Sequence, residues 1–211
     1  MRVVVAPDKF EGSLSAGQAA AAIEAGLRRA RPDAEVVRLP LGDGGAGTLE
    51  ALLAAGFRRV PVAATGPTGG PVAAAIAVDG TRAFVEMAEA SGLKRLPGGV
   101  RAPLAATTYG TGELLAAALD HGAREVVLGI GGSATTDGGA GMAAALGARL
   151  LDRTGAELPP GGAALLRLAR IDVSGLDRRL REVRVTVACD VDNPLVGPEG
   201  AAHVDGPHKG A

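Results

Sequence analysis

The segment with the clearest capacity for chemistry runs from Gly129 to Gly139 and reads Gly-Ile-Gly-Gly-Ser-Ala-Thr-Thr-Asp-Gly-Gly. It follows an apolar run that predicts a strand and precedes a pattern that predicts a helix. Glycines in such a turn let successive backbone N–H groups converge, and the N-terminus of a helix adds partial positive charge. We therefore expect a phosphate to bind here, the alternative being a tight strand-to-helix turn that binds nothing. The expected phosphate-binding residues are Gly131, Gly132, Ser133, Thr135, Gly138 and Gly139.

Asp137, within this segment, could cap the following helix or hold a cation. The pentapeptide Asp-Gly-Gly-Ala-Gly that begins at Asp137 also begins at Asp43, each time at an expected helix start. Chance is one explanation, because 33 of the 211 residues are glycine. The functional interpretation is two corners that combine an acid with backbone amides, one for a phosphate with its Mg²⁺ and one for an acceptor.

Other polar residues follow predicted strands at their carboxyl ends. In open α/β sheets, ligands bind outside the carboxyl ends of the strands, so these residues predict a shared cleft. They are Asp8 and Lys9 after the first strand, Glu86 and Glu89 after Val85, and Asp190, Asp192 and Asn193 after Ala188.

Composition excludes several classes of protein. With 22 basic and 23 acidic residues, 3 Phe, 1 Tyr and no Trp, the chain lacks the charge and the aromatic surfaces typical of nucleic-acid binding. A single cysteine, Cys189, excludes an intramolecular disulfide and a cysteine-based zinc site, and we expect it to be a small core residue. The sequence has neither a membrane-spanning apolar run nor a recognisable signal peptide, which predicts a cytoplasmic protein without membrane contact.

Periodicity predicts an α/β fold with a parallel sheet and helices on its faces. The opening alternates strands over 2–6, 35–39 and 57–63 with helices over 16–31 and 44–55. A hairpin over 72–78 and 83–87 turns at Asp79-Gly80, and alternation then returns with helix 111–121, strand 125–130, helix 138–146 and strands 148–151 and 183–188. No periodic element is predicted after Cys189. A free tail would explain this, and the alternative is a chain cut short, because the last strand lacks a covering helix.

One alternative is an NAD(P)-dependent oxidoreductase. The Gly129 segment also fits the dinucleotide pattern G-x-G-x-x-A, and Asp152 follows 23 residues later as a candidate partner for a ribose. Two features disfavour this interpretation: the pattern begins past residue 125, and Thr-Thr-Asp-Gly-Gly has no role in it. No Walker A ending is present, which excludes P-loop NTPases.

Seven segments resemble the bacterial-type glycerate kinase family, the glycerate 2-kinases, and they lie in register along the whole chain. They are residues 6–15, 42–48, 65–67, 84–93, 108–113, 129–139 and 188–195. The resemblance implies ATP-dependent phosphorylation of D-glycerate, at the 2-hydroxyl, with Mg²⁺ and without nucleic-acid or membrane partners. It leaves the oligomeric state open, a homo-oligomer included.

The resemblance also implies two α/β domains, one of them flavodoxin- or Rossmann-like with a parallel sheet. Residues 1–65 would begin the flavodoxin-like domain, and residues 66–211 would form a second α/β domain with the glycine-rich turn. The chain would be the N-terminal portion of a longer family member, incomplete at its C-terminus.

The expected catalytic residues are Asp8, Lys9, Asp43 and Asp190. Asp43 or Asp8 would accept or orient the proton of the hydroxyl group. Asp137 or Asp190 would help to hold Mg²⁺. Lys9, with Lys209 as a further candidate, would neutralise phosphate or bind the glycerate carboxylate.

Two positions depart from the family pattern that the resemblance implies. Glu11 stands where lysine is usual, and Ala46 where glutamate is usual. These departures favour a third interpretation, a non-catalytic remnant of a glycerate kinase.

Overall fold

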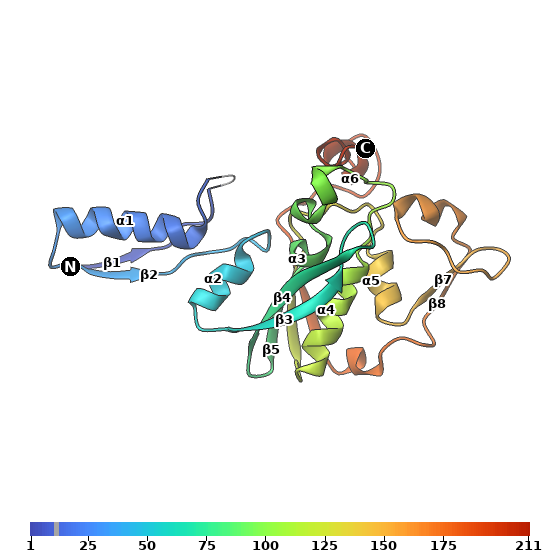
Figure 1. Cartoon of the computed structure of the whole chain (residues 1–211), viewed down its shortest axis with the longest axis horizontal. Helices are drawn as coiled ribbons and strands as arrows, with labels where there is room; N and C mark the ends of the chain where they lie inside the picture. Colours follow the sequence, from blue (N-terminus) through green and yellow to red (C-terminus); the bar gives the residue numbers. More distant parts are fainter. Residues whose placement is uncertain (11–12) are drawn as a thin grey trace.

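The computed structural model describes residues 1–10 and 13–211. At the N-terminus, the parallel strands β1 (Arg2–Val5) and β2 (Glu35–Arg38) are joined by α1 (Ala16–Ala30). Ser15 starts α1 with a capping box: its hydroxyl accepts from Gln18 N at 3.2 Å, and its own N–H donates to Gln18 Oε1 at 2.9 Å. Figure 1 shows these three elements as an arm that extends away from the rest of the chain.

A five-stranded sheet forms the centre of the larger part, with the order β3-β4-β5-β6-β9. Strands β3, β4 and β5 pair antiparallel, whereas β5, β6 and β9 pair parallel. The α/β class and a parallel arrangement in the central sheet are therefore confirmed. The strands are β3 (Arg58–Thr65), β4 (Pro71–Asp79), β5 (Arg82–Glu86), β6 (Glu125–Gly129) and β9 (Arg184–Ala188).

The expectation that residues 57–63 extend the first parallel sheet is wrong. Strand β3 pairs with β4 along its whole length, from Arg58 opposite Val78 to Thr65 opposite Pro71. The two strands are joined by a short turn in which Gly66 N donates to Gly70 O at 2.6 Å, and local antiparallel pairing needs no crossover helix. Strand β3 thus belongs to the same sheet as the strands after residue 66, while the division into two domains at residues 65 and 66 stays a prediction.

Helices cover both faces of the central sheet. On one face, α4 (Tyr109–Asp120) buries Leu114 and Ala118 against Ile76 and Val126. On the other face, α2 (Thr48–Ala54) packs Leu49 against Phe84 of β5. Both α3 (Ala88–Ser91) and α5 (Ala140–Ala145) pack beside α4. The helix that docks on β5 is the one that begins directly after the first Asp-Gly-Gly-Ala-Gly segment.

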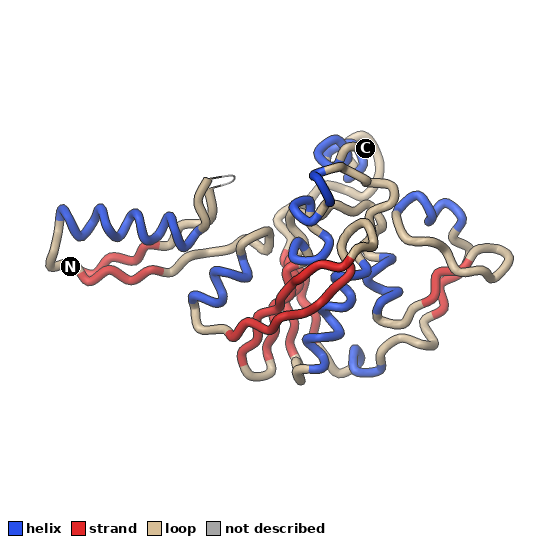
Figure 2. The backbone as a smooth tube through the Cα atoms, in the orientation of Figure 1, coloured by secondary structure: helices blue, strands red, loops and turns tan. Residues whose placement is uncertain are grey.

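The C-terminal third is mostly loop, as Figure 2 shows. Strands β7 (Arg149–Leu151) and β8 (Arg170–Asp172) form a separate antiparallel pair. Two one-turn helices, α6 (Ala201–Val204) and α7 (Gly206–Lys209), correct the expectation of no element after Cys189. Cys189 is exposed because it follows the edge strand β9, so its expected place in the core is wrong.

Short 3-10 helices complete the fold, at Leu93–Arg95, Pro97–Gly99, Gly162–Arg167 and Arg178–Arg181. Among the described residues, no helix combines the length and the apolar character needed to cross a lipid bilayer.

Candidate active site

The loop over residues 43–47 crosses the carboxyl ends of three parallel strands. Strands β5, β6 and β9 end in register at Glu86, Gly129 and Ala188. A Cβ atom at Gly129 would overlap the Gly44 carbonyl oxygen, and one at Gly44 would lie 2.9 Å from Ala188 Cβ. The loop can therefore lie directly on the sheet edge only because glycine occupies both sides of the contact.

The same loop touches the beginning of the glycine-rich turn. Gly131 N donates to Gly44 O at 3.3 Å, and a Cβ atom at Gly131 would lie 2.6 Å from Gly45 Cα. The structure thus brings the first Asp-Gly-Gly-Ala-Gly segment against the expected phosphate-binding turn, although more than 80 residues separate them in the sequence.

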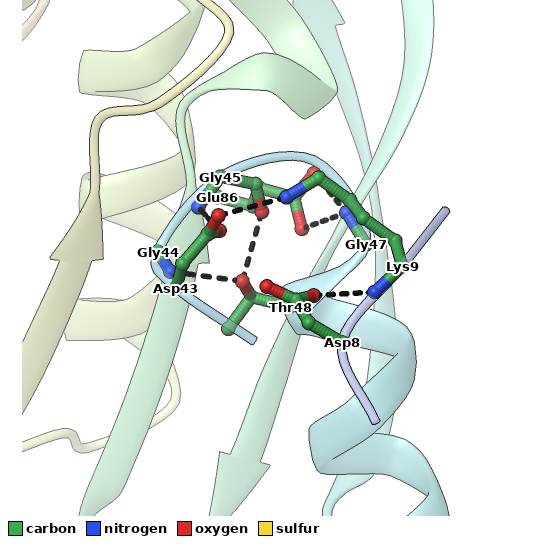
Figure 3. Close-up of polar contacts among 8 residues, drawn as sticks. All are labelled: Asp8, Lys9, Asp43, Gly44, Gly45, Gly47, Thr48 and Glu86. Carbon is green, nitrogen blue, oxygen red and sulfur yellow. Dashed lines mark hydrogen bonds and ion pairs between the residues drawn. The ribbon is translucent and has the colours of Figure 1, made fainter. Parts of the chain in front are cut away.

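Lys9 and Asp43 form an ion pair at this edge (Figure 3). Lys9 Nζ lies 2.8 Å from Asp43 Oδ2, and Gly45 N donates to Asp43 Oδ1 at 2.8 Å. The hydrogen bond from Lys9 lowers the pKa of the Asp43 carboxyl below its ordinary value. The Asp43 side chain is 38% exposed and that of Lys9 is 19% exposed, so an anionic carboxylate beside an ammonium group faces solvent.

Asp8 lies next to this pair, in the segment that follows β1. One Asp8 oxygen, Oδ1, accepts from Lys9 N at 2.6 Å. Figure 3 places Asp8 and Lys9 beside the loop over residues 43–48. The structure therefore brings together three of the four expected catalytic residues.

Glu86, which the sequence marks only as an acid at a strand end, holds the end of the loop over residues 43–47 through hydrogen bonds. Its side chain is buried, with 3% exposure, and its carboxylate accepts from Gly47 N at 3.2 Å and from Leu49 N at 2.9 Å. Burial raises the pKa of the Glu86 carboxyl above its ordinary value. Thr48 completes the loop, because its hydroxyl accepts from Gly44 N at 3.0 Å and donates to Gly45 O at 2.9 Å.

Two backbone hydrogen bonds join the first half of the glycine-rich turn to the end of α3 and the residues after it. Leu93 N donates to Gly132 O at 3.0 Å, and Ala134 N donates to Ser91 O at 2.9 Å. Gly132 has a φ of 74°, which an L side chain rarely adopts, so the chain reverses there while Gly132 and Ser133 stay partly exposed. This half of the turn lies at the surface beside the Asp43 loop.

Asp137, in the second half of the turn, is buried with 1% exposure, although Thr136 and Gly138 on either side of it are exposed. Its Oδ2 accepts from Thr108 N at 2.8 Å, Thr108 Oγ1 at 2.9 Å and Gly141 N at 3.1 Å, and its Oδ1 accepts from Gly139 N at 3.2 Å. These bonds tie the start of α4 to the start of α5. The arrangement supports the capping interpretation of Asp137, because its oxygens already have partners and do not face solvent.

Asp190, the other candidate metal ligand, follows the edge strand β9 and is exposed. Within residues 1–10 and 13–211 its carboxylate has no hydrogen-bond or ion-pair partner, and no group of three acidic, histidine or cysteine side chains is placed to hold a metal ion. Mg²⁺ in phosphoryl-transfer sites keeps several waters and uses one or two carboxylates together with the phosphates. The exposed Asp190 carboxylate is available to such a ligand, whereas both oxygens of Asp137 already accept hydrogen bonds.

Asp152 does not occupy the place of a ribose-binding acid. It follows β7, which belongs to the two-stranded sheet with β8 and is no neighbour of β6. Its Oδ1 accepts from Thr154 N at 2.8 Å and Ala156 N at 3.1 Å, which closes a surface turn. The geometry therefore disfavours the dinucleotide interpretation.

Comparison with known proteins decides the family. A family model described as the glycerate kinase family matches residues 3–211. The chain belongs to the glycerate kinase family. The resemblance seen in the seven segments is thereby confirmed.

Individual members of the glycerate kinase family match closely. A glycerate kinase of Bacillus subtilis (strain 168) is 56% identical over 214 residues, and a glycerate 2-kinase of Escherichia coli (strain K12) is 53% identical over 215 residues. Both alignments cover 100% of this chain and 56% of the relative. A crystal structure from Salmonella typhimurium LT2, ascribed to glycerate kinase 2, superposes with a TM-score of 0.89 at 53% identity, over 100% of this chain and 57% of that one. The chain thus spans little more than half the length of these relatives.

The two departures from the family pattern have different outcomes. Glu11 lies outside the described residues. Ala46 lies at the contact between the two loops, where its Cβ is 4.0 Å from the position a Cβ atom at Gly132 would take.

Proposed function

We propose that this chain carries a glycerate kinase site that transfers the γ-phosphoryl group of ATP to the 2-hydroxyl of D-glycerate. The observation that supports it most is the packing of the Lys9–Asp43 pair beside the glycine-rich turn, where Gly131 meets Gly45 at the ends of β5, β6 and β9. A kinase must hold an alcohol in line with a γ-phosphoryl group and neutralise the charge on its oxygens. An acid–lysine pair next to a turn with exposed amides meets both needs.

In this proposal, the Gly131–Thr135 part of the turn binds phosphate oxygens through those of its backbone N–H groups that have no acceptor within the described chain. Asp43 accepts a hydrogen bond from the attacking hydroxyl group and orients it, and Lys9 keeps Asp43 anionic while offering positive charge to the glycerate carboxylate. Asp8 lies beside Lys9 and is the alternative group for the hydroxyl proton. The lowered pKa of Asp43 suits an orienting role, because the loose transition state of phosphoryl transfer demands little basicity from the protein.

Asp190 would supply a carboxylate ligand to Mg²⁺. When bound with the nucleotide, Mg²⁺ neutralises charge on the β- and γ-phosphates. In the transfer itself, the glycerate oxygen forms a bond to phosphorus, and the bond between phosphorus and the ADP oxygen breaks. The hydroxyl proton, hydrogen-bonded to Asp43, passes to solvent. Gly139 N already donates to Asp137, and Gly138 adopts a φ of 59° beside it, so in this proposal the two glycines shape the turn and do not touch phosphate.

Three further parts of the proposal come from the sequence. The protein acts in the cytoplasm, residues 1–65 begin a flavodoxin-like domain, and residues 66–211 form the second domain. The arm of β1, α1 and β2 supports a separate N-terminal unit. Strand β3, before residue 66, pairs with β4 of the second domain.

The test is to incubate the chain with ATP, Mg²⁺ and D-glycerate and to follow the products by ³¹P NMR. We expect ADP and 2-phosphoglycerate to appear in equal amounts. Appearance of 3-phosphoglycerate would overturn the assignment of the hydroxyl, and absence of any phosphoglycerate would favour a non-catalytic chain. A change in NADH fluorescence on mixing, without ATP turnover, would favour the oxidoreductase alternative.

A further inference from the structure

Lys209 reaches from the C-terminal helix α7 to the glycine-rich turn. Its Nζ donates to Ser133 Oγ at 2.6 Å and to Thr135 O at 2.7 Å. These contacts join residues 74 and 76 positions apart in the sequence. Lys209 thus holds its ammonium group against the surface half of the turn that follows β6.

The ammonium group of Lys209 forms no ion pair within the described chain. Both of its acceptors are neutral oxygens, and the carboxylates of Asp205 and Asp137 attract it only from beyond ion-pair distance. The side chain is partly buried, and burial lowers the pKa of the Lys209 ammonium group below the ordinary value for lysine. A partly desolvated cation costs free energy unless an anion compensates it, so the position favours an anionic ligand.

Two backbone N–H groups next to Lys209 also lack acceptors. Within the described parts of the chain, the amides of Gly132 and Ser133 donate to no oxygen, although those of Gly131 and Ala134 on either side do. Ser133 Oγ accepts from Lys209, which leaves its own O–H free to donate. Donors on Lys209, Ser133 and Gly132 are therefore unused at one place on the surface.

We propose that Lys209 binds a phosphoryl oxygen of the nucleotide together with the Gly132 and Ser133 amides. This inference rests on the proposed function, because it assigns the positive charge that completes the phosphate site. The lysine supplies the charge, and the amides and the Ser133 hydroxyl fix the direction from which the oxygen approaches. Lys209 retains its two protein contacts and directs its third N–H bond to the ligand.

The chain has three lysines, Lys9, Lys94 and Lys209, so ¹³Cε-lysine NMR can follow each of them. In the free chain we expect Lys209 to titrate below the ordinary range for lysine. Addition of MgADP should raise the pKa of Lys209, because a bound oxyanion stabilises the charged form, and the signal of the exposed Lys94 serves as an internal reference. A purely structural lysine would show no such response to nucleotide.

A matched pair of variants tests the same contact by calorimetry. Lys209→Met should weaken MgADP binding about tenfold, the size expected for one charge-assisted hydrogen bond. Arg178→Met is the control, because it removes one positive charge far from the turn. Its neighbour Arg179 contacts Asp120 at the C-terminal end of α4, whereas the glycine-rich turn contacts the N-terminal end of α4. This control should leave the affinity unchanged.

The outcomes separate this inference from the kinase proposal. If MgADP leaves the pKa of Lys209 unchanged, or if D-glycerate alone raises it, the phosphoryl assignment is overturned. If MgADP raises it but no phosphoglycerate forms, the Lys209 site stands and the glycerate kinase activity fails.

Discussion

The chain uses the pentapeptide Asp-Gly-Gly-Ala-Gly twice, and the two copies begin with the same local structure. In each copy the N–H group of the third residue donates to Oδ1 of the aspartate, from Gly45 to Asp43 at 2.8 Å and from Gly139 to Asp137 at 3.2 Å. Each copy leads into a helix, α2 or α5. The peptide itself therefore determines how the first carboxylate oxygen is used.

The second oxygen distinguishes the copies. Asp43 Oδ2 meets the Lys9 ammonium group at the surface, whereas Asp137 Oδ2 accepts from Thr108 and Gly141 in the interior. One aspartate remains able to meet a ligand, and the other serves the fold. The difference shows that a motif is open to chemistry only where the surrounding strands leave its outer oxygen exposed.

The largest expected effect follows Asp43→Asn. The amide keeps an oxygen for Gly45 N but loses the charge that pairs with Lys9 and orients the hydroxyl group. We expect ATP turnover with D-glycerate to fall by about 10²–10⁴-fold, while the free energy of unfolding changes by less than about 1 kcal/mol because the pair is exposed. Steady-state kinetics and urea unfolding would measure both quantities. Asp33→Asn, at an exposed turn, is the control, and turnover within threefold of wild type in Asp43→Asn would contradict the assigned role.

Asp137→Asn makes the same chemical change in the other copy and should act on stability. The amide has a single oxygen, so its NH₂ group must face either Gly139 N or the pair Thr108 N and Gly141 N, and at least one N–H group loses its acceptor. We expect a loss of about 2–3 kcal/mol in the free energy of unfolding. Urea unfolding monitored by circular dichroism measures it, and a loss no larger than that of Asp43→Asn would show that the two copies are not distinguished in this way.

Much of the fold was predictable from local patterns, and the difference between the copies was not. Strand 125–130 and helix 111–121 were expected almost as found, at Glu125–Gly129 and Tyr109–Asp120, because periodicity depends on neighbouring residues. The placement of β3 was missed because its partner is chosen by a hairpin turn. Two identical pentapeptides offer no local signal to show which one is buried.

The site was predictable only where residue type was enough. Asp8, Lys9 and Asp43 were expected as catalytic residues, the two acids for the hydroxyl proton and the lysine for an anionic group, and the structure brings them together. The part played by Glu86 depends on contacts across 37 and 39 residues, and that of Lys209 on contacts across 74 and 76 residues. Their identity as an acid at a strand end and a lysine near the C-terminus was visible, but the partners that give them a role were not.

Gly129→Ala tests whether close packing holds the Asp43 copy at the strand ends. The new methyl group would overlap Gly44 O, so the loop over 43–47 must move or the strand must shift. Overpacking of this kind costs about 1–3 kcal/mol, and we also expect lower turnover because Asp43 moves with the loop. Gly70→Ala is the control, since a Cβ atom there meets no other atom within 4 Å. Unchanged stability and turnover in Gly129→Ala would mean that the loop is not held by this contact.

The smallest expected effect is the pH dependence of stability that comes from Glu86, the buried acid that holds the loop of the Asp43 copy. Burial raises the pKa of Glu86 in the folded chain, so its contribution to stability is full below the unfolded value, near 4.3, and is lost as pH rises through the folded value. Glu86→Gln removes this titration and keeps one oxygen, which in the place of Oε2 can still accept from Gly47 N and Leu49 N. Asp43, whose lowered pKa acts in the opposite direction, titrates in both proteins and largely cancels from the comparison. Urea unfolding between about pH 4 and pH 7 should therefore show the wild type losing stability relative to Glu86→Gln, with no such trend for the exposed Glu125→Gln. A trend in favour of the wild type would mean that the Gly47 and Leu49 bonds outweigh the burial of the carboxylate.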